Sequence, residues 1–156
     1  MIRSDFESLF SLNSSALWVL HTDKIPPHIG ISDTTGFYSL KVKGKDTAVP
    51  LDKIMALINK KKIPTLIFEL SPGSISELKS VFERFEIADS EGITCLEPIK
   101  TATNISDVET VHELIRVLEK RKSILQKFGF HLPDSFDGIK RYTKQDILNR
   151  LKYLEQ

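Results

Sequence analysis

The apolar positions in the first seventy residues follow patterns that are typical of β-strands. Residues 16–20 (ALWVL) and 65–70 (TLIFEL) are almost continuous apolar runs, which predicts two strands buried on both faces. Residues 28–32 and 37–42 lie on either side of an Asp-Thr-Thr-Gly segment, whose residue types favour a tight turn. The pattern therefore predicts an antiparallel hairpin between two buried strands.

Helical periodicity appears between and after these strands. Residues 51–60 place apolar side chains on one stripe, and residues 74–85 do the same after a capping box of Ser74 and Glu77. A last short strand is predicted over residues 92–96, ahead of a proline. Strands mixed with helices in this order predict an α+β fold with a largely antiparallel sheet and flanking helices.

The rest of the chain has the periodicity of helices. An amphipathic helix is predicted over residues 106–128, and a closing helix begins at Thr143. A short helix is also predicted over residues 4–10. We expect residues 1–103 to form the α+β domain, and residues 104–156 to form a helical extension that packs on it.

Composition excludes several classes of protein but does not indicate an activity. The chain has 156 residues and a formal net charge of +1, so no bulk field draws it to nucleic acid or to an anionic membrane. It has no apolar run of transmembrane length, and the charges near Met1 are unlike a secretory signal. We therefore expect a cytoplasmic protein without a membrane span or a nucleic-acid partner.

Cysteine content and motif spacing exclude several kinds of site. The single cysteine, Cys95, excludes an intramolecular disulfide and a cysteine-rich metal site. The sequence has no glycine-rich phosphate loop, no dinucleotide fingerprint and no histidine spacing typical of a metal site. No cofactor and no metal are therefore predicted.

Lysines are conspicuous in two places. Lys41, Lys43 and Lys45 alternate along one predicted strand, and residues 60–62 are three lysines at the end of a predicted helix. Such residues can contact phosphate or an acidic partner. They also protect an edge strand and complement the negative end of a helix dipole. The absence of interleaved aromatic residues favours this structural interpretation.

Two residues carry the candidate chemistry. A lone cysteine between Ile93 and Leu96 is most often a small buried apolar residue, whereas a reactive Cys95 needs a nearby histidine to form a thiolate. His28 is the best-placed histidine, because it opens a strand after two prolines, and Gly30 leaves room beside its imidazole. Burial of His28 at a strand edge is the competing interpretation.

These segments resemble a known family. Pro27-His28-Ile-Gly-Ile, a turn and Gly36-Phe-Tyr-Ser-Leu resemble the histidine hairpin of circularly permuted NlpC/P60-like proteins, which include the lecithin:retinol acyltransferase group. The resemblance covers residues 16–100 and rests on a short motif. It implies a papain-like fold in which His28 is the general base and Cys95 the nucleophile. The implied reaction is hydrolysis of, or acyl transfer from, an amide or ester of a small molecule or peptide.

The sequence departs from the family pattern at the residue that orients the histidine. The strand after His28 offers Tyr38, Ser39 and Lys41, none of which is expected to be a good acceptor for the imidazole N–H, and Glu69 and His21 are further candidate supporting residues. A degenerate site on the same fold is therefore the alternative. In that case the C-terminal helices would present a face to a protein partner or to a second copy of the chain.

Overall fold

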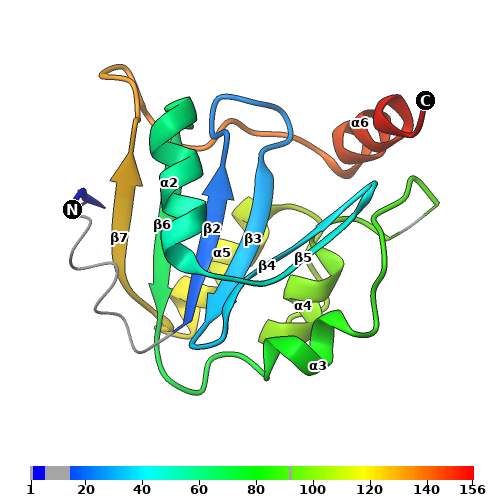
Figure 1. Ribbon diagram of the computed structural model, residues 1–156, viewed down its shortest axis with the longest axis horizontal. Coiled ribbons are helices and arrows are strands. Elements are labelled where there is room, and N and C mark those ends of the chain that lie inside the picture. Colours follow the sequence, from blue (N-terminus) through cyan, green and yellow to red (C-terminus); the bar gives the residue numbers. More distant parts are fainter. Residues whose placement is uncertain (1, 6–14, 92) are drawn as a thin grey trace.

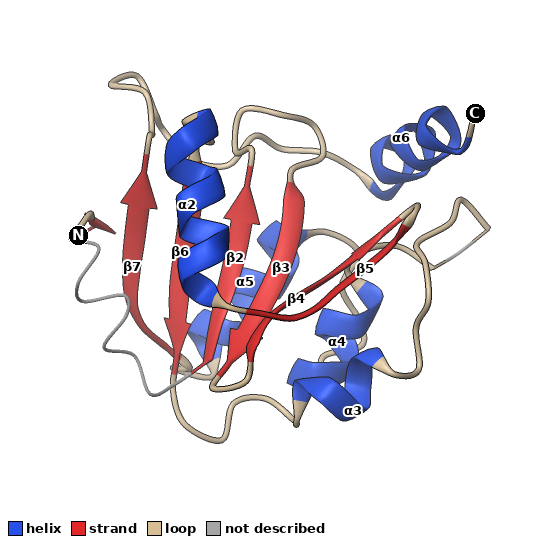
Figure 2. Cartoon of the chain, in the orientation of Figure 1, coloured by secondary structure: helices blue, strands red, loops and turns tan. Residues whose placement is uncertain are grey.

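A computed structural model describes residues 2–5, 15–91 and 93–156, and it shows an α+β protein (Figure 1). In the described residues, seven strands form one sheet and five helices lie around it (Figure 2). The strands are β1 (Ile2–Arg3), β2 (Ser15–Leu20), β3 (His28–Asp33), β4 (Gly36–Lys41), β5 (Gly44–Val49), β6 (Thr65–Leu70) and β7 (Ile124–Phe130). The helices are α2 (Leu51–Lys61), α3 (Leu78–Phe82), α4 (Glu97–Thr103), α5 (Val111–Lys120) and α6 (Lys144–Glu155).

The sheet has the strand order β1-β7-β6-β2-β3-β4-β5. Strand β1 runs parallel to β7, and every other neighbouring pair is antiparallel. The predictions of an α+β fold and of a largely antiparallel sheet are confirmed. The central position of β2, between β3 and β6, explains why its sequence is apolar throughout.

Alternate side chains of the central strands pack into two separate hydrophobic cores, one on each face of the sheet. Leu17 and Val19 face the core that α3, α4, α5 and α6 cover, whereas Trp18 and Leu20 face the core under α2. Figure 1 shows α2 in front of the sheet and α5 behind it. Successive side chains of a strand point to opposite faces, so helices on both sides make the apolar run of β2 favourable.

Several predicted elements are confirmed by the structure. Strands β2, β3, β4 and β6 and helix α2 occupy the predicted segments within one or two residues. Helix α6 begins after Thr143, whose side chain and that of Asp146 form a reciprocal capping box. The helix predicted over residues 4–10 falls mostly on residues outside those that the structure describes.

The helix predicted over residues 106–128 is confirmed over residues 111–120 and is wrong at both ends. Helix α5 begins one turn later, because the Thr110 side chain accepts the Glu113 amide, and it ends before Lys122, which is left-handed with φ 56°. The chain then forms β7 beside β6. Helical spacing of apolar residues could not reveal that β6 leaves an edge for this segment to complete. Residues on both sides of Thr103 therefore contribute to one sheet.

Two other predicted elements are corrected. The helix predicted over residues 74–85 is reduced to α3, because the Ser74 hydroxyl bonds Ser71 instead of capping a helix. The strand predicted over residues 92–96 is also wrong for its described residues, 93–96. Residues 93–96 form a loop and a turn that lead into α4, and the proline that was expected to end a strand lies in the first turn of that helix.

The lysines at 41, 43 and 45 do not share one strand. Lys41 ends β4, Lys43 lies in the turn, and Lys45 belongs to β5. The Lys45 ammonium donates to the carbonyls of Phe82 and Phe85 at 2.7 and 2.8 Å, so it caps the carbonyl end of α3. This contact supports the structural interpretation for Lys45.

Gly30 is explained by packing and not by room for a ligand. A Cβ atom on Gly30 would lie 2.2 Å from Cζ of Phe37 and 3.1 Å from the carbonyl oxygen of Tyr38. The Phe37 ring fills the space that the sequence suggested was left free beside the imidazole. The expectation of an open space at Gly30 is therefore wrong.

This contact gives a stability prediction. We expect Gly30→Ala to lower the free energy of unfolding by about 2 kcal/mol, because an extra methyl group overpacks a fully buried site. Replacing Phe37 by leucine in the same chain should recover part of that loss. Urea unfolding of both variants measures the effect. A Gly30→Ala protein as stable as the wild type would contradict this packing.

Candidate functional site

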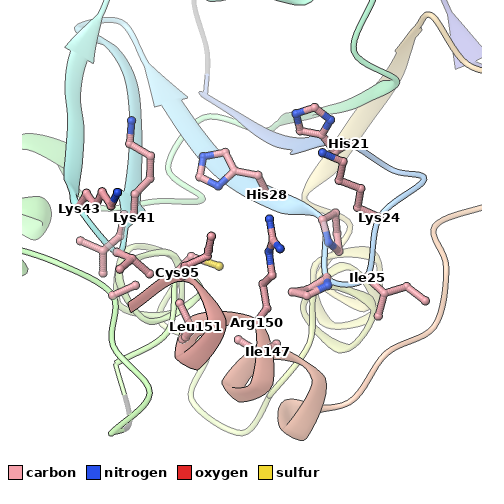
Figure 3. A pocket seen from close by; sticks show the side chains of 16 residues that line it. His21, Lys24, Ile25, His28, Lys41, Lys43, Cys95, Ile147, Arg150 and Leu151 are labelled. Carbon is pink, nitrogen blue, oxygen red and sulfur yellow. The ribbon is translucent and has the colours of Figure 1, made fainter. Parts of the chain in front are cut away.

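A pocket of about 760 Å³ lies where the start of β3, the β4–β5 turn and α6 meet. Figure 3 shows His28 and Cys95 on its wall, together with side chains from α6. Cavities of roughly 300–1,000 Å³ are the usual size of small-molecule sites. The fold thus brings the two predicted reactive residues, which are far apart in the sequence, to one concave surface.

His28 is oriented by a chain of polar side chains on neighbouring strands. Its Nε2 lies 3.2 Å from Oγ of Ser39, which in turn donates to Oδ2 of Asp46 at 2.7 Å. Ser39 and Asp46 are directly opposite each other in the β4–β5 ladder. The Lys41 ammonium donates to Oδ1 of Asp46 at 3.1 Å. Both carboxylate oxygens of Asp46 are therefore engaged as acceptors.

This chain determines which nitrogen of His28 carries the proton. A serine hydroxyl has a single proton, and Ser39 gives it to Asp46. Ser39 must then accept from His28, so Nε2 of the neutral ring carries the hydrogen. The lone pair is left on Nδ1, for which the structure records no hydrogen bond to the described residues. His28 is thus a neutral imidazole with a free basic nitrogen.

Burial keeps His28 neutral. Removal of the ring from water, against the opposing effect of Asp46 and with a smaller contribution from the Lys41 ammonium, lowers the pKa of His28 to about 4. The pKa of His21, on the same pocket, is also lowered, first by burial and then by Lys24. Both rings are unprotonated bases at neutral pH.

Cys95 lies in the turn immediately before α4, partly buried against the main core. Desolvation raises the pKa of its thiol to about 11, although a backbone hydrogen bond from Ile29 partly offsets the effect. No hydrogen bond joins Cys95 to His28 among the contacts of the described residues. The resting site therefore holds a thiol and a neutral imidazole, and not a thiolate–imidazolium pair.

The other predicted supporting residues lie in different places. His21 lines the pocket together with His28 and Cys95. Glu69 accepts from the Gln126 amide across the β6–β7 pair and does not line the pocket. Tyr38 is fully buried against Phe82 in the core. The structure brings together three of the five predicted residues.

The expectation that Ser39 is a poor acceptor for His28 is wrong, and sequence reasoning missed Asp46, which accepts from Ser39. Ser39 and Asp46 come together only because the chain reverses at residues 42–43 and β5 returns beside β4. A signal was present in Gly44, which follows this turn with φ 136°. The predicted strand over residues 37–42 extends into this turn, and the alternating lysines beyond it fit the continuation of a single strand, so the sequence pattern does not reveal the second arm.

The part of the chain that the structure describes also bears on other kinds of site. It contains no group of three or more histidine, cysteine or acidic side chains able to hold a metal ion. None of the helices described here is both long and apolar enough to cross a membrane. Comparisons of this chain with protein-family models, curated proteins and solved structures give no match.

Proposed function

We propose that the pocket is the active site of a thiol-dependent hydrolase or acyltransferase acting on an ester or amide. The observation that carries the proposal is that Cys95 and His28 line one pocket, with His28 oriented through Ser39 to Asp46. Strongly shifted pKa values in a cleft are typical of functional sites, and these two residues have them. The proposal agrees with the resemblance to permuted NlpC/P60-like proteins, and Ser39 with Asp46 supplies the orienting role that their pattern requires.

In the proposed reaction the proton moves as the new bond forms. Nδ1 of His28 takes the Cys95 proton while Sγ attacks the carbonyl carbon of the substrate. The imidazolium then protonates the leaving alcohol or amine, and an acyl thioester remains on Cys95. Water, or an acceptor alcohol or amine, attacks the thioester with Nδ1 again as the base. This step releases the acyl product and restores the thiol.

The pKa values of the two groups explain why we expect proton transfer and the attack of Sγ to occur together. The pKa values of about 11 for Cys95 and about 4 for His28 differ by about seven units. Ionisation of the thiol and protonation of the imidazole are therefore both unfavourable in the free pocket at neutral pH. Transfer of the thiol proton to Nδ1 as Sγ attacks a bound carbonyl group removes the need for a separate ion pair. Catalytic hydrogen bonds are commonly long before substrate binds.

A second candidate function is ligand binding without reaction. It is favoured by the raised pKa of the Cys95 thiol, since the thiolate is the nucleophile. In this alternative, Cys95 is part of the apolar wall and His28 accepts a hydrogen bond from the ligand through Nδ1.

An activated ester separates the two candidates. With a p-nitrophenyl ester, we expect Cys95→Ala to abolish turnover above buffer and His28→Gln to lower kcat/KM by about 10²–10⁴. Cys95 is the chain's only cysteine, so intact mass spectrometry can detect the acyl adduct at a unique thiol. His131→Gln is the matched control, because His131 is an exposed histidine that bonds Asn59 and does not line the pocket.

The outcomes have opposite meanings. A mass increase that is lost in Cys95→Ala and slowed in His28→Gln supports the reaction. Equal turnover by the wild type and Cys95→Ala would overturn it, and so would a wild type that is no faster than buffer. If the wild type is no faster than buffer, binding without reaction is the remaining function of the pocket.

A further inference from the structure

The charged side chains of the pocket all have the same sign. Its sixteen lining residues include Lys24, Lys41, Lys43 and Arg150, and none of them is an aspartate or glutamate. Figure 3 shows Lys41 and Lys43 on one side of the pocket, Lys24 on the other, and Arg150 rising from α6 between them. Residues from three separate parts of the fold thus place cationic side chains around one cavity.

Most of these cations have no carboxylate partner in the described residues. Lys41 is paired with Asp46, at 3.1 Å. Within the described chain, no salt bridge is recorded for Lys24, Lys43 or Arg150. Whole-chain net charge is only +1, so this clustering is local and is not a consequence of composition. An anion entering the pocket would meet three positive groups that are not already neutralised.

The remaining wall of the pocket is aliphatic. Side chains from the proline segment before β3, from the β4–β5 hairpin, from the loop between α3 and α4, and from α6 provide it. These residues are Ile25, Pro26, Pro27, Leu40, Val42, Ala88, Ile147, Leu151 and Leu154. Burial of apolar surface against this wall provides affinity, while the cations select the sign of charge.

We infer that the pocket binds a small amphipathic anion, with a carboxylate or phosphate group on an aliphatic body. This inference rests on the proposed active site and names its substrate class, although it does not require Cys95 to react. The aliphatic body lies against the α6 wall, and the anionic group lies among Lys24, Lys43 and Arg150. A polyanion such as nucleic acid does not fit this arrangement, because the apolar wall would be left without a partner.

Binding of four short amphiphiles tests the inference. We expect titration calorimetry of the full chain to show binding of octanoate and octyl phosphate at least tenfold tighter than octanol or octyltrimethylammonium. Raising the salt concentration from 0.05 to 0.5 M should weaken binding of the two anions and leave octanol unchanged. Equal affinity for the cationic and anionic amphiphiles would overturn the inference, as would no binding of either anion.

Variants identify the charges responsible. We expect Lys43→Gln and Arg150→Gln each to weaken octanoate binding by up to about fivefold, and the double variant by about tenfold or more. Lys152→Gln is the matched control, because Lys152 is an exposed cation of α6 that does not line the pocket. Undiminished octanoate binding by the double variant, or an equal loss in Lys152→Gln, would contradict the assignment.

The same measurement separates this inference from the proposed reaction. Octanoate binding by Cys95→Ala, together with no ester turnover by the wild type, would leave the anion site in place and remove the reaction. Turnover of neutral esters without selective anion binding would support the reaction and remove the anion site. Each proposal can therefore fail independently of the other.

Discussion

Lowering the pH from 7 to 4 is expected to destabilise the protein by about 3 kcal/mol through His28 alone. The pKa of His28 is about 4 in the folded protein and near 6.5 when the chain is unfolded. Between these values the unfolded state binds the proton more strongly, so stability falls as the pH is lowered through this window. The contribution is fully present above pH 6.5 and is lost toward pH 4.

Urea unfolding of the wild type and His28→Gln across this window measures the effect. Glutamine keeps a donor for Ser39 but does not titrate, so the stability difference between the two proteins should change by about 3 kcal/mol from pH 7 to pH 4. His131→Gln should follow the wild type. A constant difference between wild type and His28→Gln would show that His28 titrates normally.

Replacing Trp18 by alanine is expected to lower the free energy of unfolding by about 4 kcal/mol. The side chain is completely buried between the sheet and α2, with its ring edge-on to Phe37 at 5.5 Å. Its removal leaves a large cavity. It also leaves the buried Ser32 hydroxyl without the indole Nε1 hydrogen, which now donates to it at 2.8 Å.

Two further variants separate these contributions. Trp18→Phe keeps most of the volume and removes the hydrogen bond, and should cost about 2 kcal/mol. Adding Ser32→Ala to Trp18→Phe should recover part of this loss, because no unsatisfied hydroxyl remains. Tyr153→Ala, at a side chain that is 66% exposed, is the control and should change stability by less than about 0.5 kcal/mol. A Trp18→Ala protein within 1 kcal/mol of the wild type would contradict this account of the core.

Local sequence signals were sufficient where an element's residues determine its own conformation. The apolar runs of β2 and β6 and the capping box at Thr143 each predicted the correct element. These local signals failed where the conformation of a segment depends on a neighbouring strand. Residues 124–128 fit a helical stripe as well as a strand, and only the edge of β6 beside them makes the strand favourable.

The candidate site shows the same division. By itself, the sequence determined the α+β class, the hairpin that carries His28, and the identity of the single thiol, because these depend on residue type and short-range spacing. The tertiary structure alone decided that Ser39 and Asp46 orient His28, that the Cys95 thiol and the imidazole are both neutral, and that cationic side chains without a recorded carboxylate partner line one pocket. Hydrogen-bond partners, desolvation and local charge all come from residues that are distant in the chain, and short-range patterns contain no information about them.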